Sequence, residues 1–218
     1  MKENIGKLAV FVMIAAMAML TVVSTESAGQ NLGNFIIQGH YAVTGTNQCV
    51  IGFFNADNSP TQIVATLAGY NEGIYTFNMD GSGYFVGLSH SVIDPDQALV
   101  GQTYGASYST YKFTYRVTEG GAISFRSVPC TYCGGCPSLP NPVHPDCSKC
   151  AGINDPVPLT GVISPDGMSL NVTCGGPIYL HPCDSYGGSL ISGAPSFACD
   201  IFFTGFKVPN TYALPTIY

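Results

Sequence analysis

The sequence predicts an all-β fold, an antiparallel up-and-down (meander) barrel of about eight strands, with a β-sandwich as the alternative. Two observations support this prediction. Three segments alternate apolar and polar residues, reverse at a glycine-containing turn and alternate again, which is the pattern of a β-hairpin. No segment shows the apolar spacing of a long amphipathic helix. A barrel is favoured because closure removes the exposed edge strands of such an apolar sheet.

The three hairpins lie in the middle of the chain, and their turns are the clearest local signals. The first turns at Asp80-Gly81-Ser82-Gly83, the second at Glu119-Gly120-Gly121 and the third at Pro165-Asp166-Gly167. Alternating residues flank each turn, over 75–88, 111–128 and 159–172. Each segment therefore predicts two paired antiparallel strands.

The strands outside the hairpins are predicted from shorter patterns. Residues 40–44 are expected to form a first strand that ends in a turn at 45–47, and residues 49–54 form a second apolar run. Residues 61–70 are expected to form a further strand, and residues 199–208 the last one.

The motifs YTFNMDGSG, FTYRVTEGGAISF and TGVISPDGMSLNV resemble the hairpins of small secreted bacterial proteins with lipocalin-like or avidin-like barrels. The resemblance covers residues 39–173 and lies in the repeated turn pattern. It implies a barrel that can hold a ligand. Lipocalins have a Gly-x-Trp signature near the first strand, and this chain has no tryptophan. No lipocalin ligand residues are therefore transferred to it.

Residues 1–28 are predicted to be a secretory signal peptide, and residues 29–218 a single β-barrel domain. Lys2 and Lys7 precede an apolar run over 8–23, and small residues follow the run at Ser24, Ser27 and Ala28. Cleavage is expected after Ser24 or after Ala28. The alternative is an uncleaved membrane anchor, but the run is short for a bilayer span. The protein is therefore expected to be secreted, periplasmic or extracellular, without stable membrane insertion.

The charge pattern excludes several kinds of partner. Charged residues make up only 9% of the chain, and the net charge is −6. Without a basic patch, the chain is not expected to bind nucleic acid or an anionic membrane surface.

The segment 128–158 contains five of the nine cysteines and seven of the fifteen prolines. Because proline lacks a backbone donor, we expect this segment to be a loop insertion rather than part of the sheet. Its cysteines follow the pattern C-x2-C-x2-C, then C-x2-C: Cys130, Cys133, Cys136, Cys147 and Cys150. Disulfides are the favoured interpretation for an exported protein. Zinc is the alternative, with Cys130, His144 or Asp146 as substitute ligands. The third is a redox-active pair at Cys133 and Cys136 or an iron–sulfur site that begins with Cys130, Cys133 and Cys136.

The other four cysteines are predicted to form two disulfides. Cys49 and Cys199 lie near the first and last strands, which are neighbours in a closed meander, so we expect them to pair. Cys174 and Cys183 are expected to close the intervening loop. Since nine is odd, one thiol must be free, bind metal or join another chain, and a covalent dimer is a further hypothesis.

No catalytic constellation is evident, so the protein is not expected to be an enzyme. The four histidines are scattered, and neither Gly-x-Ser-x-Gly nor His-Glu-x-x-His occurs. Four tyrosines over 104–115 are candidate binding residues at a barrel mouth or partner face: Tyr104, Tyr108, Tyr111 and Tyr115.

The sequence therefore predicts a secreted, non-enzymatic β-barrel protein that binds a small apolar ligand, a surface or a protein partner. One alternative is a structural or assembly component of the cell exterior, clamped by its Cys-rich loop. The other is an exported metal-binding or enzymatic protein that uses the cluster from Cys130 to Cys150.

Overall fold

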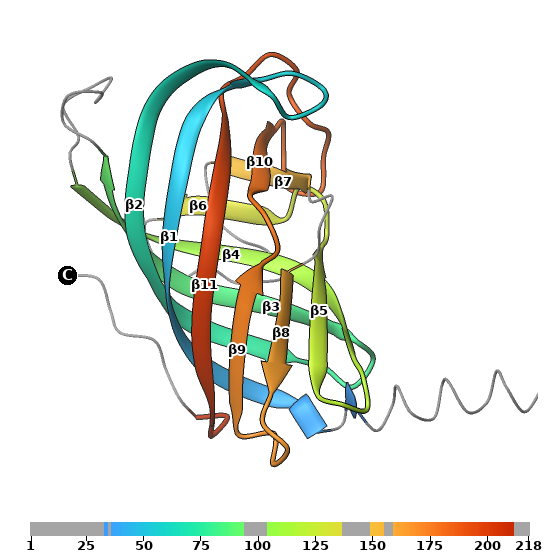
Figure 1. Cartoon of the computed structure of the whole chain (residues 1–218). Coiled ribbons are helices and arrows are strands. Elements are labelled where there is room, and N and C mark those ends of the chain that lie inside the picture. Colours follow the sequence, from blue (N-terminus) through green and yellow to red (C-terminus); the bar gives the residue numbers. More distant parts are fainter. Residues whose placement is uncertain (1–32, 35, 94–103, 137–148, 155–158, 212–218) are drawn as a thin grey trace, which may run out of the picture.

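The computed structural model describes residues 33–34, 36–93, 104–136, 149–154 and 159–211, and these form one antiparallel sheet of eleven strands (Figure 1). The strands are β1 (Gly39–Phe54), β2 (Pro60–Phe77), β3 (Ser82–Ile93), β4 (Tyr104–Val117), β5 (Ala122–Ser127), β6 (Tyr132–Cys136), β7 (Lys149–Asn154), β8 (Leu159–Ile163), β9 (Ser169–Cys174), β10 (Ile178–Cys183) and β11 (Ser196–Val208).

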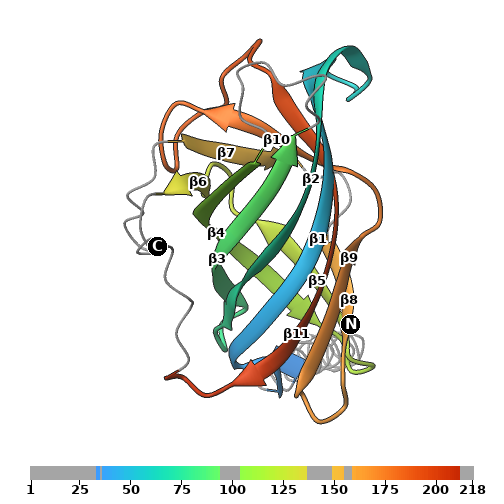
Figure 2. The ribbon, with the colours of Figure 1, turned by 90° about the vertical axis from the view of Figure 1, so that its left-hand side faces the viewer.

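The sheet closes on itself because the first strand pairs with the last. β1 and β11 are antiparallel in a continuous register from His40 opposite Val208 to Gly52 opposite Ser196. Figure 2 shows the long strands wrapping around the enclosed interior. We call the end with the 55–59 connection the upper end and the end with the turns near Gly121 and Gly167 the lower end.

Six short strands form one side of the ring in two tiers. β5 and then β6 pair along β4, while β9 and then β10 pair along β11. Between them, β8 joins β5 to β9 in the lower tier, and β7 joins β6 to β10 in the upper tier. Each tier, together with β1, β2, β3, β4 and β11, completes a ring of eight strands. The structure thus confirms the predicted all-β meander, with three of its eight strands broken in two.

The breaks lie at prolines. Pro129 lies between β5 and β6, and Pro177 lies between β9 and β10. A proline cannot donate to the strand ladder, so pairing stops there and resumes beyond it. The segment 128–158 differs here from the expected loop insertion, because β6 and β7 are part of the ring. All seven of its prolines fall outside these two strands, which explains how so proline-rich a segment contributes to a sheet.

The three predicted hairpins are present as β2–β3, β4–β5 and β8–β9. Their turns end in Gly81, Gly121 and Gly167, all with positive φ, a conformation that glycine adopts without steric cost. The predicted turn at residues 45–47 is wrong, because β1 continues through it. Gly45 is needed there for space, since a Cβ would lie 2.5 Å from Cβ of Phe203 on β11.

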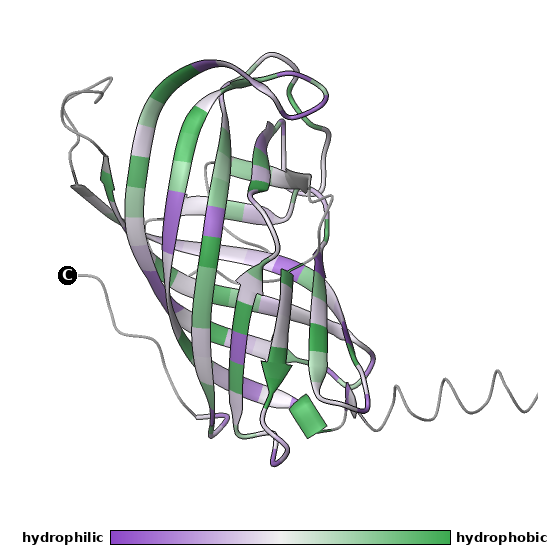
Figure 3. Ribbon diagram, viewed as in Figure 1, coloured by the Kyte–Doolittle hydropathy of each residue, from purple (hydrophilic) through white to green (hydrophobic). Residues whose placement is uncertain are grey.

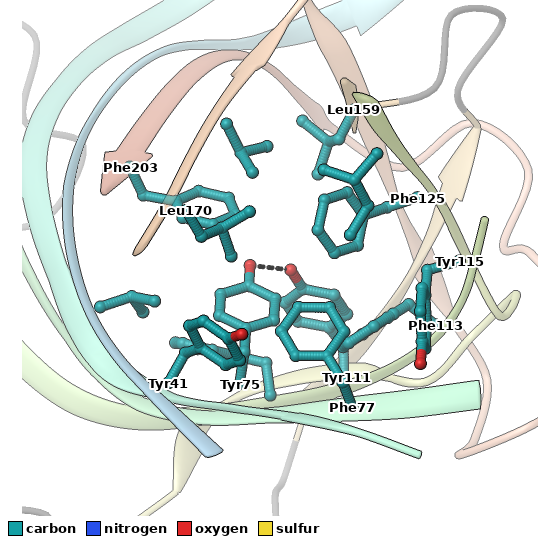
Figure 4. Close-up of a cluster of buried hydrophobic side chains, with 14 of the residues drawn as sticks. Tyr41, Tyr75, Phe77, Tyr111, Phe113, Tyr115, Phe125, Leu159, Leu170 and Phe203 are labelled. Atoms are coloured by element: carbon teal, nitrogen blue, oxygen red, sulfur yellow. Dashed lines mark hydrogen bonds between the residues drawn. The ribbon is translucent and has the colours of Figure 1, made fainter. Parts of the chain in front are cut away.

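Side chains of the lower tier fill the interior. The buried residues there combine aromatic and aliphatic side chains, and Figure 4 shows several of them converging from opposite walls. Tyr41 and Phe77 meet edge to face at 5.4 Å between ring centroids, and Phe113 and Phe125 do so at 5.3 Å. Ile37, ahead of β1, is fully buried in the same cluster. Apolar and polar segments succeed one another along β1 and β2, whereas β11 is mainly apolar (Figure 3) and exposes Phe202 and Phe206 on its outer side.

Among the described residues, no helix has the length and apolar character that crossing a membrane requires.

Candidate ligand cavity

The upper tier surrounds a partly open cavity of about 250 Å³. It lies between the aromatic cluster and the upper end of the ring, and both long and short strands contribute to it. The side chains that line it include Val43, Asn47, Cys49, Leu67, Asn71, Tyr75, Phe85, Ser89, Ser91, Ser107, Ser109, Tyr111, Tyr132, Leu159, Ile178, Leu180, Phe197, Cys199, Ile201 and Phe203.

The floor of the cavity is the top of the aromatic cluster. The ring of Tyr75 is stacked on that of Phe203 with 4.8 Å between centroids and an interplanar angle of 11°. The hydroxyl groups of Tyr75 and Tyr111 hydrogen-bond to each other (Figure 4). Burial raises the pKa of both tyrosines, because the phenolate form would lose its hydration. Both therefore present neutral rings to the cavity.

One wall of the cavity is polar. Asn47 on β1 and Asn71 on β2 line it, followed by serines on β3 and β4: Ser89, Ser91, Ser107 and Ser109. The hydroxyls of Ser89 and Ser109 lie 3.3 Å apart. Tyr132 on β6 hydrogen-bonds to both serines, which lowers its pKa, although the larger effect of burial leaves that pKa raised. This part of the wall therefore has its own hydrogen bonds.

The two asparagines differ from the serines. Oδ1 of Asn47 and Oδ1 of Asn71 are buried, and neither accepts a hydrogen bond from the described residues. A buried polar atom without a partner costs about 1–3 kcal/mol. Because both oxygens are buried, they face the surrounding strands rather than the open space of the cavity.

Glycines opposite the asparagines make room for their side chains. Asn47 pairs with Gly69 across β1 and β2, and Asn71 pairs with Gly45. A Cβ on Gly69 would lie only 2.7 Å from Oδ1 of Asn47. The asparagines are diagonal neighbours on the inner face of the same strand pair, so their amides lie side by side.

The lining next to β1 on the other side is apolar. Phe197 and Ile201 on β11 contribute to it, with Ile201 directly opposite Asn47 in the β1–β11 pair, and Ile178 and Leu180 on β10 continue it. Among the described residues that line the cavity, none is Asp, Glu, Lys, Arg or His. The cavity therefore combines one hydrogen-bonding wall with an aromatic and aliphatic remainder and has no charge of its own.

Three disulfides hold the ring around the cavity. Cys49 and Cys199 form the predicted disulfide between β1 and β11, directly across the strand pair. Cys133 on β6 is bonded to Cys150 on β7, and Cys130 is bonded to Cys183 at the end of β10. Tyr132 and Gly134 line the cavity, so Cys133 between them points outward. The last two disulfides therefore tie the upper-tier strands together on the outer face.

The predicted Cys174–Cys183 disulfide is wrong. β10 continues the direction of β9 along β11, which places Cys183 roughly 16 Å beyond the start of β10, at 3.3 Å per residue. Cys174 is a free thiol instead. Its Sγ accepts a hydrogen bond from the backbone N–H of Ile201 at 3.0 Å, where β11 passes from β9 to β10. The thiol thus satisfies a backbone donor at the break between the two strands.

Three of the five cluster cysteines, Cys130, Cys133 and Cys150, form disulfides. Because Cys133 is bonded to Cys150, the hypothesis of a redox-active pair between Cys133 and Cys136 is wrong. Several candidate metal ligands lie outside the described residues: the side chain of Cys136, and the residues His144, Asp146 and Cys147. Among the described residues, no group of three or more His, Cys, Asp or Glu side chains could hold a metal ion.

The four candidate binding tyrosines do not share one face. Tyr111 lines the cavity floor, and Tyr115 lies in the filled lower tier, where its hydroxyl donates to the backbone oxygen of Asn78. Tyr108 is buried but alternates with these inward residues, so it belongs to the outer face of β4. Tyr104 begins β4, and its side chain lies outside the described residues. Only Tyr111 of the four is placed at the cavity by the described residues.

A second hollow of about 690 Å³ lies on the outer surface near the upper end. Outward side chains line it, among them Phe54, Ile63, Val92 and Tyr179. It is larger than the cavity but more open, so a small molecule there would stay largely in contact with water. The cavity inside the ring, which is less open, is the better candidate for a ligand site.

Two histidines of the described part, His40 and His181, pair with hydroxyl groups. Nδ1 of His40 lies 2.8 Å from Oγ1 of Thr76, and Nδ1 of His181 lies 2.8 Å from Oγ of Ser196. Burial lowers the pKa of His181. These are pairs on separate strands, away from the residues that line the cavity.

The sequence-based prediction missed the polar wall. Asn47 falls in the stretch expected to be a turn, and the serines have no motif of their own. One signal was available, since Ser89 and Ser91 on β3, and Ser107 and Ser109 on β4, occur at the period of two that side chains on one face of a strand have.

Comparisons with protein-family models, with curated proteins and with solved structures find no match for this chain.

Proposed function

We propose that this protein is a secreted, non-enzymatic carrier or receptor that binds a small, mainly apolar molecule in the cavity of its upper tier. The observation that supports the proposal is the contrast between the two tiers: the same ring is filled by side chains below and surrounds a cavity of about 250 Å³ above. Interiors normally pack without such space, so a cavity with a few polar groups in an apolar lining favours ligand binding. Three disulfides favour an oxidising compartment.

A cavity-filling variant tests the proposal. Gly134 on β6 lines the cavity, and a Cβ at this position would meet no atom within 4 Å. Gly134→Leu therefore introduces a side chain into free space inside the ring. The matched control is Gly120→Leu, at the exposed β4–β5 turn of the lower end, where a Cβ also meets no atom within 4 Å.

The probe is 2-acetyl-6-dimethylaminonaphthalene, a neutral fluorophore whose emission reports an apolar environment. We expect the unmodified protein and Gly120→Leu to bind it with equal affinity. We expect Gly134→Leu to bind at least about tenfold more weakly, because the added side chain occupies the space of the ligand. Equal binding by all three proteins would show that the cavity is not where the molecule binds.

A further inference from the structure

The upper part of the serine wall indicates which molecules the cavity binds. We infer that the ligand is a small neutral molecule with an apolar ring system on the aromatic floor and one acceptor oxygen, a carbonyl, that contacts the hydroxyl groups of Ser91 and Ser107. This inference rests on the proposed function and deepens it.

The serine wall contains two diagonal pairs of side chains with the same relation across β3 and β4. Ser89 is opposite Ser107, and Ser91, the next inward residue of β3, is opposite Gly105. The diagonal neighbour of Ser89 on β4 is Ser109, and their Oγ atoms lie 3.3 Å apart. The diagonal neighbour of Ser91 in the same sense is Ser107, so one small group can contact both of these hydroxyls.

The two pairs differ in their hydrogen bonds. Ser89 and Ser109 interact with each other and with Tyr132. In the described part of the chain, the hydroxyls of Ser91 and Ser107 have no hydrogen-bond partner. Both residues are half-buried and line the cavity, and neither hydroxyl is among the buried atoms without a partner. Their hydroxyls are therefore open to a bound molecule.

The acceptor oxygen follows from the chemistry of a pair of hydroxyls. Each hydroxyl has one proton to donate. A carbonyl oxygen has two lone pairs and can accept from both hydroxyls at once, whereas a single N–H group can pair with only one of them. A hydrocarbon at this position would exclude water and leave both hydroxyls without a partner, which is costly.

The neutrality follows from the lining. Among the described residues that line the cavity, none has a charged side chain. An ion would lose its hydration there without meeting a countercharge, which is the costliest way to bury a group. The net charge of −6 is a further cost for an anion.

The apolar ring system follows from the floor. Tyr75 and Phe203 are stacked there beside Tyr111 (Figure 4). Ser107 lies four residues above Tyr111 on β4, which is roughly 13 Å at about 3.3 Å per residue. A ligand of about two fused rings with a carbonyl substituent spans most of this length.

The ligand is expected to lie with its oxygen toward the upper end of the ring. Gly105, opposite Ser91, is exposed, and a Cβ there would meet no atom within 4 Å. The serine pair is therefore next to open space, whereas the floor is the deepest part of the cavity.

Matched probes test the inference by displacement of 2-acetyl-6-dimethylaminonaphthalene. They are 2-acetylnaphthalene, the hydrocarbon 2-isopropenylnaphthalene, in which a CH2 group replaces the carbonyl oxygen, and the anion 2-naphthoate. We expect the ketone to bind about tenfold more tightly than the hydrocarbon and naphthoate to be the weakest. A cavity without donors would instead prefer the hydrocarbon, because it is the more apolar of the two. Equal or tighter binding of the hydrocarbon would overturn the acceptor requirement, and naphthoate binding as tightly as the ketone would overturn the neutrality.

A double variant locates the effect. Ser91→Ala/Ser107→Ala removes only the two hydroxyls, and Ser124→Ala, on the outer side of β5, is the matched control. Because the fluorophore also has a carbonyl group, its own affinity is first measured for each protein by direct titration. We expect the double variant to lose about tenfold in affinity for the ketone and to keep its affinity for the hydrocarbon, while the control matches the unmodified protein.

Thermal unfolding without ligand separates contact with the ligand from a structural role. The double variant should melt no earlier than the unmodified protein, because the two hydroxyls have no partner among the described residues. Earlier melting together with weaker binding of both compounds would contradict the inference, since the hydroxyls would then support the wall. An unchanged affinity for the ketone would contradict it as well.

The Gly134→Leu variant distinguishes failure of this inference from failure of the proposed function. If it weakens the ketone and the hydrocarbon while the serine double variant changes neither, the cavity binds ligands but the acceptor requirement is wrong. If it weakens neither compound, the cavity is not the binding site, and the proposed function fails together with the inference.

Discussion

The hydroxyl groups of Tyr75 and Tyr111 are partners of each other in the middle of the aromatic cluster. Both side chains are buried, with exposed fractions of 4% and 8%, and their hydrogen bond joins β2 to β4. Because both rings also form the cavity floor, this bond fixes the surface on which a ligand would rest. Such a pair stabilises the fold only while both hydroxyls are present.

Phenylalanine substitutions test this pair. We expect Tyr75→Phe and Tyr111→Phe each to lower the free energy of unfolding by about 1–3 kcal/mol, since either leaves one buried hydroxyl without a partner. The double variant should cost less than the sum of the two, with a coupling energy of about 1 kcal/mol. Urea unfolding of the four proteins without ligand measures this cycle. Strict additivity would show that the two hydroxyls do not depend on each other.

The elements that the sequence predicted well are those specified by neighbouring residues. The hairpins β2–β3, β4–β5 and β8–β9 combine alternation with a glycine turn, and both signals lie within a few residues. The strands β6, β7 and β10 were missed because they have only five or six residues and lie among prolines. β6 and β10 are strands because β4 and β11 extend beyond β5 and β9 and offer them edges, and β7 pairs in turn with β6 and β10.

The cysteine pairs also differ in how far they could be predicted from the sequence. Cys49 and Cys199 were predicted from the neighbourhood of first and last strands in a meander. Cys183 could not be assigned, because its partner Cys130 becomes a neighbour only when β7 and β10 pair in the upper tier. The polar wall was hidden for a related reason: Asn47 and Asn71 meet only through the register of β1 and β2.

The upper-tier strands are expected to depend on their disulfides more than the rest of the ring does. β6 pairs with β7 over only three residues and with β4 over two. The Cys133–Cys150 disulfide closes a sequence separation of 17 residues, which corresponds to about 3 kcal/mol in the chain-entropy model. Replacing both cysteines with serine should therefore loosen β6 and β7 first.

Hydrogen exchange read by mass spectrometry tests this dependence. In Cys133→Ser/Cys150→Ser, we expect faster exchange in β6 and β7, unchanged exchange in the lower parts of β1, β2 and β11, and weaker binding of the neutral fluorophore. Cys174→Ser is the control, since it removes a cysteine without removing a disulfide. Equal acceleration in every strand would show that the two tiers unfold as one unit.

In the molecule as a whole, the lower end of the ring is expected to supply most of the stability and the upper end to bind the ligand. The lower tier is filled by aromatic and aliphatic side chains from opposite walls, and their burial stabilises the fold (Figure 4). The upper tier has fewer paired residues in its short strands, two disulfides on its outer face and the cavity. We expect the lower tier to keep the ring closed while the upper tier adapts to a ligand.

The tyrosines of this interior make the whole fold sensitive to alkali. Burial raises the pKa of Tyr41 to about 12, against an ordinary 10.0, with a smaller contribution from the charge of Asp166. Burial likewise raises the pKa values of Tyr75, Tyr111, Tyr115 and Tyr132. A raised acid pKa means that the folded protein holds protons that the unfolded chain releases. The resulting stabilisation is complete below pH 10 and is lost as the pH rises through the folded-state values.

We therefore expect the free energy of unfolding to fall steeply between pH 10 and about pH 12, and the folded protein to unfold as its buried tyrosines ionise. Urea unfolding at a series of pH values, followed by circular dichroism together with tyrosinate absorbance, measures both events. Tyr41→Phe removes one of the coupled groups, so its stability should fall less steeply over this range. Complete ionisation of all thirteen tyrosines with an unchanged circular dichroism spectrum would contradict the prediction, because it would mean that the aromatic interior admits charge without opening.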